Sequence, residues 1–130
     1  MSLNYQDIEA AVLSEKDAGG FAKLMKDFQA LGVEKYDYLV ADGLYRYYDS
    51  DSSIDLQMNA VPKSVEALGD STKIKLAVQG AQAGKFDFER FCELAGQAGV
   101  LYWRSDLIAK NVSYFDTQGN ALLIEPIPGI

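Results

Sequence analysis

The sequence predicts one α+β domain in which two helix–helix–strand–strand–strand units share a mostly antiparallel sheet of about six strands, with the helices packed mainly on one face. Three observations support this prediction. Apolar residues recur every three or four positions in some segments and every second position in others, in two successive blocks. The chain has 130 residues, 48% of them hydrophobic, which suits a single domain with its own core. Finally, the two halves match each other at a fixed offset.

The first half is predicted to begin with two helices. Asn4 can cap the first, which ends before Gly19 and Gly20. The second has apolar side chains three and four residues apart, and Gly32 follows where a helix commonly ends in a left-handed residue. Its apolar side chains are Phe21, Leu24, Met25, Phe28 and Leu31. We interpret this stripe as a core face.

A β-hairpin is predicted next, because the period changes to two from Lys35 onward. Asp42 and Gly43 separate two alternating runs and predict a two-residue type I′ turn, in which both central residues have positive φ. In that register Tyr38 would pair with Tyr47.

The remaining elements follow from the same patterns. They are a strand over 54–58, helices over 71–81 and 87–98, and strands over 100–106, 112–116 and 121–125. Gly84 and Gly99 end the two helices, and Gly119 can take the left-handed position of the last hairpin loop. Pro126 ends strand pairing.

The two halves of the sequence match without a gap, each match lying 67 residues after its partner, as Phe88 does after Phe21. The other matches are Gly32 and Val33 with Gly99 and Val100, Tyr36 with Trp103, and residues 47–50 with 114–117. They fall at helix anchors, helix ends and strand aromatics. We therefore treat residues 1–130 as a single domain with an internal repeat of about 5–60 and 71–126. Coincidental likeness of two similar units is the alternative at this point.

Many of these residues also resemble a known family. They are residues 31–33, Tyr36, Asp42 and Gly43, residues 84–88, Phe91, Cys92, residues 98–100, Trp103, Asp106, Tyr114 and Asp116. Over nearly its whole length the chain resembles the uncharacterised YdfO/YbcV-like domains of bacteria and prophages, some of which are labelled phage envelope proteins. The resemblance implies an α+β fold and a bacterial or prophage origin, with no established activity. No signal, membrane span or fibre repeat in this sequence supports the envelope label.

The composition excludes several kinds of chemistry. The sequence has no histidine, which excludes Ser-His-Asp and Cys-His catalysis and the common zinc sites. Cys92 is the only cysteine and is interpreted as a buried core residue. The acidic segment 49–55 departs from a calcium loop, with Ile54 where glycine is needed and Ala60 where glutamate is needed. We predict no catalytic residue, no metal and no cofactor.

Net charge and hydropathy limit the classes of partner and the cellular compartment that we expect for this protein. The net charge of −7 disfavours nucleic acid and anionic membranes as partners. The first residues lack the basic start and apolar stretch of a signal peptide, and no apolar run approaches 18 residues. We therefore expect a cytoplasmic protein.

The tyrosine-rich hairpin is the candidate binding surface. Alternation places four of its tyrosines on one sheet face and Tyr48 on the other, and tyrosine is enriched at interfaces. The candidate residues are Tyr36, Tyr38, Tyr45, Tyr47, Trp103, Arg104, Asp106 and Tyr114. They favour a small non-enzymatic binding or protein-interaction module that could form a homodimer or take another protein partner. The alternative interpretation is that the rings only pack beneath the helices.

A second hypothesis is a small enzyme that uses carboxylate and tyrosine acid–base chemistry. Asp106 lies in a predicted strand, where aspartate is disfavoured, beside Arg104. With Tyr114, these residues would have to converge on one concave pocket.

Overall fold

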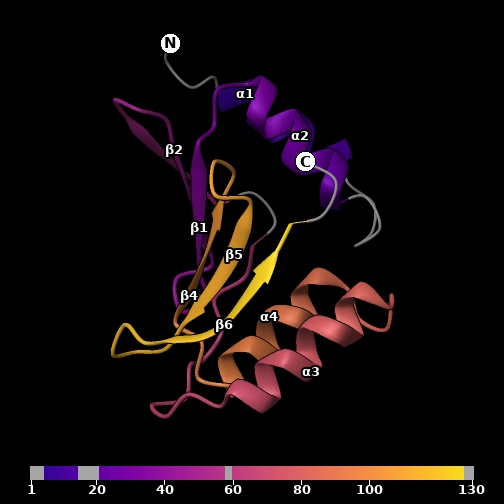
Figure 1. The fold of residues 1–130 in the computed structure, drawn as a ribbon, viewed down its shortest axis with the longest axis vertical. Helices are drawn as coiled ribbons and strands as arrows, with labels where there is room; N and C mark the ends of the chain where they lie inside the picture. The colour runs from indigo at the N-terminus through magenta and orange to yellow at the C-terminus, as the bar shows by residue number, and fades with distance from the viewer. Residues whose placement is uncertain (1–4, 15–20, 58–59, 128–130) are drawn as a thin grey trace.

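The computed structural model describes residues 5–14, 21–57 and 60–127 (Figure 1). The helices are α1 (Tyr5–Ser14), α2 (Phe21–Ala30), α3 (Ser71–Gln82) and α4 (Phe88–Gln97). The strands are β1 (Lys35–Leu39), β2 (Leu44–Tyr48), β3 (Ser53–Leu56), β4 (Tyr102–Asp106), β5 (Asn111–Phe115) and β6 (Ala121–Pro126). All neighbouring strands are antiparallel, in the order β3-β2-β1-β4-β5-β6. The predicted α+β fold is confirmed.

The predicted element boundaries agree closely with the structure. The strand expected over 54–58 is β3, and Met58 lies outside the described residues, as do Asn4, Gly19 and Gly20. Four glycines predicted at helix ends or in the last hairpin loop have positive φ: Gly32 (89°), Gly84 (77°), Gly99 (79°) and Gly119 (84°). The helix ends and the last hairpin loop therefore use glycine as expected.

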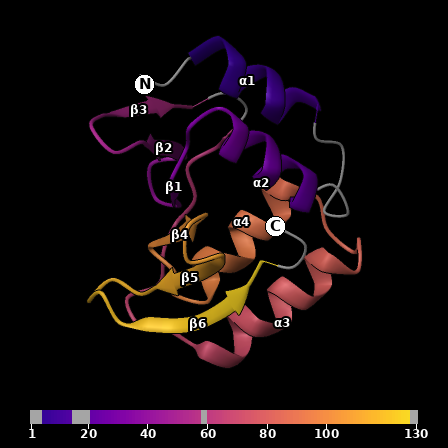
Figure 2. The same cartoon turned by 45° about the horizontal axis from the view of Figure 1, so that its top comes forward.

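The molecule has two layers, with the sheet on one side and the helices on the other (Figure 1). Figure 2 shows α1 and α2 beside the β1–β3 half of the sheet, and α3 and α4 beside the β4–β6 half. Burial alternates along β2, β4 and β5, so one sheet face is covered and the other is half-exposed. The core lies between the covered face and the helices.

The register predicted for the first hairpin is wrong. Tyr38 pairs with Tyr45 instead of Tyr47, and four residues, 40–43, connect β1 to β2. Among these four only Gly43 has positive φ (61°), and its N–H donates to the carbonyl of Leu39 at 2.9 Å. The connection is therefore not a two-residue type I′ turn.

Val40 supplies the physical reason for the longer connection. Its side chain is fully buried, and its N–H donates to the carbonyl of Leu101 at 2.9 Å. Its own carbonyl accepts the N–H of Lys63 at 3.1 Å. Because Val40 is bonded to segments outside the hairpin, it cannot also extend the β1–β2 ladder. The pairing moves by two residues, and a shift of two leaves every side chain on its predicted face.

Three elements of the first half recur in the second. We call α2, β1 and β2 unit 1, and α4, β4 and β5 unit 2. Each boundary in unit 2 lies 67 residues after its counterpart in unit 1. The turn residues Gly43 and Lys110 share this relation, and both have positive φ, 61° and 64°. Asp37 in β1 lies opposite Arg104 in β4, and these two residues occupy equivalent positions of the two units. An approximate twofold axis therefore passes between them.

The segment that joins the two units, residues 60–70, packs across unit 2. Glu66 N–H donates to the carbonyl of Gly96 at 2.9 Å, and Asp70 N–H donates to that of Ala98 at 2.8 Å. These bonds hold the segment against the end of α4. At its start, Val61 is placed beside the first turn of the same helix.

Candidate functional site

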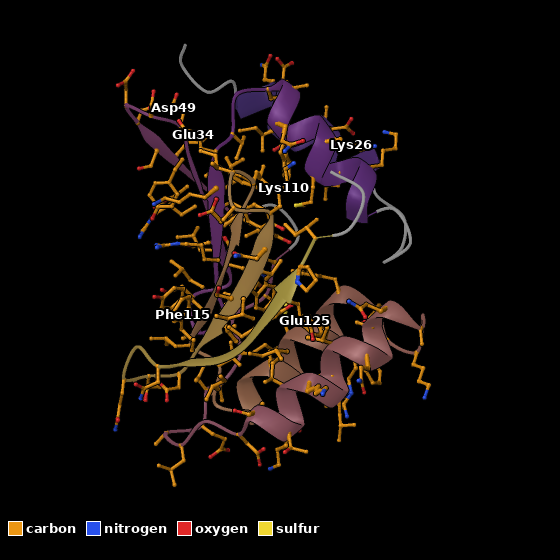
Figure 3. All side chains as sticks on the ribbon, in the orientation of Figure 1. Lys26, Glu34, Asp49, Lys110, Phe115 and Glu125 are labelled. Carbon is orange, nitrogen blue, oxygen red and sulfur yellow. The ribbon has the colours of Figure 1, made fainter. Side chains whose placement is uncertain are left out.

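The aromatic face predicted to be a contact surface lies in the core. Five tyrosines and one tryptophan of this face have exposed fractions between 0% and 8%. They are Tyr36, Tyr38, Tyr45, Tyr47, Trp103 and Tyr114. Phe28 of α2 meets Tyr47 edge-to-face at 5.2 Å, while Tyr38 stacks on Trp103 at 4.6 Å. This face is therefore not available to a second copy of the chain, and Figure 3 shows side chains filling the space beneath the helices.

Arg104 lies on the opposite, open face, where it pairs with Asp37. Its guanidinium makes two bonds to the Asp37 carboxylate, at 2.7 and 2.9 Å, and the Tyr48 hydroxyl donates to the same carboxylate at 3.2 Å. Only 6% of the Asp37 side chain is exposed. The hydrogen bond that Arg104 donates to Asp37 raises the pKa of Arg104 above its usual range. Arg104 thus neutralises a buried carboxylate between the two units.

Asp106 has a structural explanation. It is the last residue of β4, and its Oδ1 accepts the N–H groups of Ile108 at 3.0 Å and Ala109 at 2.9 Å. Aspartate is favoured in such turns because its side chain can bond backbone two residues on. Tyr114 belongs to the covered face, whereas Asp106 is on the open face. The three residues of the enzyme hypothesis therefore do not converge on one pocket.

The covered aromatic face reaches the surface at the first turn of α4, where the structure has a pocket of about 300 Å³. We call it the α4 pocket; its walls are Tyr38, Val61, Asp87, Phe88, Glu89 and Cys92. Phe88 and Val61 stand at the mouth and are 38% and 41% exposed. Asp87 fixes the start of α4, because its Oδ1 accepts the N–H of Arg90 at 2.8 Å.

The inner end of the α4 pocket carries two neutral polar groups. Tyr38 is 0% exposed, and its hydroxyl has no hydrogen-bond partner among the described residues. The Cys92 thiol is the neighbour of the Tyr38 hydroxyl, and a weak side-chain hydrogen bond between them contributes to the pKa of both groups, although the pair does not meet strict hydrogen-bond geometry. Burial raises the pKa of Cys92 to about 12 and that of Tyr38 well above its ordinary value. Both groups therefore stay protonated at neutral pH.

An unpartnered buried hydroxyl needs an explanation, because the large majority of buried polar atoms have a partner. A second such group, the Tyr47 hydroxyl, is enclosed beneath α2 and lines no part of the α4 pocket. Tyr38 differs from Tyr47 in that its side chain is part of the wall of the α4 pocket, which opens to solvent. A bound molecule could supply the missing partner of the Tyr38 hydroxyl.

Only Tyr38 among the predicted site residues lines the α4 pocket. Phe88 and Cys92 follow the helical period and were interpreted as core, while Asp87 was predicted only as the start of a helix. Val61 reaches the pocket because residues 60–70 fold back on α4, a long-range contact that no local pattern signals. The one residue in the sequence that could have pointed to this pocket was Phe88, an aromatic residue in the first turn of a predicted helix.

Two further findings bear on the kind of site. Across residues 5–14, 21–57 and 60–127, cysteine and carboxylate side chains nowhere gather in a group of three or more that could hold a metal ion. Over the same part of the chain, no helix combines the length and the apolar character needed to cross a bilayer.

A family model described as "Protein of unknown function (DUF1398)" matches residues 9–126. The chain belongs to the DUF1398 family. This confirms the expectation of a family without assigned activity, while the YdfO/YbcV name and a prophage origin stay predictions. The DUF1398 match includes both units and every residue of the α4 pocket. A search of curated proteins finds no match to the chain.

Proposed function

We propose that this DUF1398 protein is a non-enzymatic binding module and that the α4 pocket is its binding site. The observation that carries the proposal is a pocket that opens to solvent and has in its wall the buried aromatic residue Tyr38, whose hydroxyl meets no strict hydrogen-bond partner. Ligand pockets typically combine apolar and aromatic walls with a few well-placed polar groups, in volumes from about 300 Å³ upward. The α4 pocket has this character at the small end of the range.

The walls favour a flat apolar ring as the ligand body. Phe88 contacts Tyr38 edge-to-face at 5.2 Å and stacks on Tyr45 at 5.9 Å. Trp103 backs the same group from β4. Because these rings brace one another, the wall is held in place before a ligand arrives, which lowers the entropic cost of binding.

The volume limits the ligand to one ring with a short substituent. A cavity of about 150 Å³ is enough to take a benzene ring, and the α4 pocket is about twice that size. A hydroxyl on the ring would meet the Tyr38 hydroxyl at the inner end. The two inner groups, Tyr38 and Cys92, are protonated at neutral pH and offer neither a base nor a thiolate.

The test uses a neutral probe, 2-(4-hydroxyphenyl)ethanol, titrated into isotopically labelled protein and followed by amide chemical shifts. We expect the shifts to change at Tyr38, Val61 and residues 87–92. Tyr38→Phe removes the inner hydroxyl and should weaken binding about fivefold to tenfold, the equivalent of roughly one hydrogen bond.

Tyr47→Phe is the matched control, because it removes another buried, unpartnered hydroxyl that does not line the α4 pocket. It should leave the affinity unchanged. If the probe does not bind, or if Tyr47→Phe weakens binding as much as Tyr38→Phe does, the proposal is wrong.

A further inference from the structure

We infer that the ligand of the α4 pocket is a cation, namely an aromatic ring with a hydroxyl group at one end and a protonated amine on a short chain at the other. This inference rests on the proposed binding function. The charges around the pocket carry it. Two of the six lining residues, Asp87 and Glu89, are acidic, and none is basic.

The nearest cations are already engaged by other carboxylates. Lys63 bonds Glu89 at 3.1 Å and also lies 3.8 Å from Glu93, and its side chain is mostly buried against them. Arg90 pairs with Glu93. Glu89 and Glu93 therefore share the two cations, and Asp87 has no cationic partner among the described ion pairs. The mouth of the pocket keeps a net negative charge.

The field of these carboxylates extends inward. Burial is the main cause of the raised pKa of Cys92; the hydrogen bond with Tyr38 and the charge of Lys63 lower this pKa, while the charges of Glu89 and Asp87 raise it. A cation at the mouth would be stabilised by the same two carboxylates. It would also lie near the Phe88 ring, and a cation within about 6 Å of a ring face is attracted to it.

The inner end of the pocket limits the chemistry of the buried end of the ligand. Tyr38 and Cys92 present neutral hydrogen-bonding groups, so the buried end of the ligand must be polar but uncharged. A ring hydroxyl meets this requirement, whereas a buried carboxylate would find no cation there. The N–H groups of a helix start can bind an anion, but at α4 the Asp87 carboxylate already occupies that position.

The experiment compares three probes that share a 4-hydroxyphenyl ring and differ in the terminal group: tyramine, 2-(4-hydroxyphenyl)ethanol and 4-hydroxyphenylacetate. Affinities are measured by isothermal titration calorimetry at pH 7 and low salt. We expect tyramine to bind about tenfold more tightly than the alcohol, and the carboxylate to bind most weakly. The preference for tyramine should shrink as salt is added, because solvent-exposed charges are screened.

Asp87→Asn removes the unpaired charge and keeps a good helix cap. It should weaken tyramine binding about threefold to fivefold, in line with an exposed charge pair, and so lower the preference for tyramine over the alcohol. Asp70→Asn makes the same change at the start of α3, where Asp70 accepts the N–H of Lys73 away from the pocket, and should change neither affinity.

The outcomes separate the two proposals. If the alcohol or the carboxylate binds as tightly as tyramine, or if Asp87→Asn leaves tyramine binding intact, the cationic ligand is wrong and the binding function stands. If none of the three probes binds, both proposals are wrong.

Discussion

Units 1 and 2 have the same backbone plan but different side chains at the place where the α4 pocket forms. Ser105 is the unit 2 equivalent of Tyr38, and Met25 is the unit 1 equivalent of Cys92. Ser105 is also fully buried with an unpartnered hydroxyl, but it is too short to span the space that the Tyr38 ring crosses. The shared backbone plan sets a helix start beside a strand twice, and side-chain size decides what forms there.

The largest effect on the free energy of unfolding should appear at high pH, because both units bury ionisable groups on the aromatic face. Burial raises the pKa of Cys92 to about 12. It also raises the pKa of four tyrosines well above their ordinary value: Tyr38, Tyr45, Tyr47 and Tyr114. In the unfolded chain these groups titrate near 8.5 and 10. The stability that these groups contribute is therefore complete below about pH 8.5. Above its unfolded pKa, each buried group lowers the free energy of unfolding by about 1.4 kcal/mol per pH unit.

We expect the free energy of unfolding, measured by urea titration followed by circular dichroism, to fall by several kcal/mol between pH 9 and pH 11. Tyr47→Phe and Tyr114→Phe change equivalent positions of the two units, and each should make this fall shallower by about 1.4 kcal/mol per pH unit above about pH 10. Tyrosinate absorbance that rises while the protein remains folded would contradict this.

A smaller effect is expected at the axis between the units. Arg104→Leu leaves the buried Asp37 carboxylate without its cation and should lower the free energy of unfolding by about 3 kcal/mol. The comparison is Arg46→Leu, because Arg46 pairs with Asp55 at 2.8 Å but both side chains are more than a third exposed. That change should cost less than about 1 kcal/mol.

Thermal and urea unfolding of both variants check this difference. Asp37→Leu combined with Arg104→Leu removes the buried charge as well as its partner and should recover part of the lost stability. Equal costs for Arg104→Leu and Arg46→Leu would show that the axis pair contributes no more than a surface pair.

The smallest pair of effects concerns the equivalent turn residues Gly43 and Lys110. A Cβ at Gly43 would lie 2.5 Å from the nitrogen of Pro62, and φ there is positive, so Gly43→Ala should cost about 2 kcal/mol. Lys110 is the only non-glycine residue of the described chain with positive φ. Lys110→Gly should relieve that strain and raise the free energy of unfolding by about 0.5–1 kcal/mol.

Opposite signs for these two variants in urea unfolding would show that the shared turn is strained in unit 2 and glycine-dependent in unit 1. A loss of stability on Lys110→Gly would mean that the side chain of Lys110 contributes more than its backbone strain costs.

Much of the fold could be predicted from local patterns. Helix and strand positions follow from periods of 3.6 and 2, and the shared face of Tyr38 and Tyr45 survived a wrong register because the error was two residues. The turn itself was mispredicted, because Val40 bonds to Leu101 and Lys63, which are distant in sequence. Local sequence cannot report such competition for a backbone group.

The candidate site was harder to predict. An alternating strand shows that one face is buried but not which, because the open face also carries apolar residues such as Leu39 and Leu44. Phe115 illustrates this, since it lies on the side away from the helices and stacks on Tyr102 at 4.8 Å (Figure 3). The α4 pocket depends on how residues 60–70 pack, which no pattern within that segment indicates.

The most direct test of the α4 pocket is an amide chemical-shift titration of the whole chain with tyramine, because it compares equivalent positions of the two units in one experiment. Binding at the α4 pocket predicts shift changes at Tyr38 and Cys92 and none at Ser105 and Met25. Equal changes at both pairs, or changes confined to the open face around Arg104, would contradict the account.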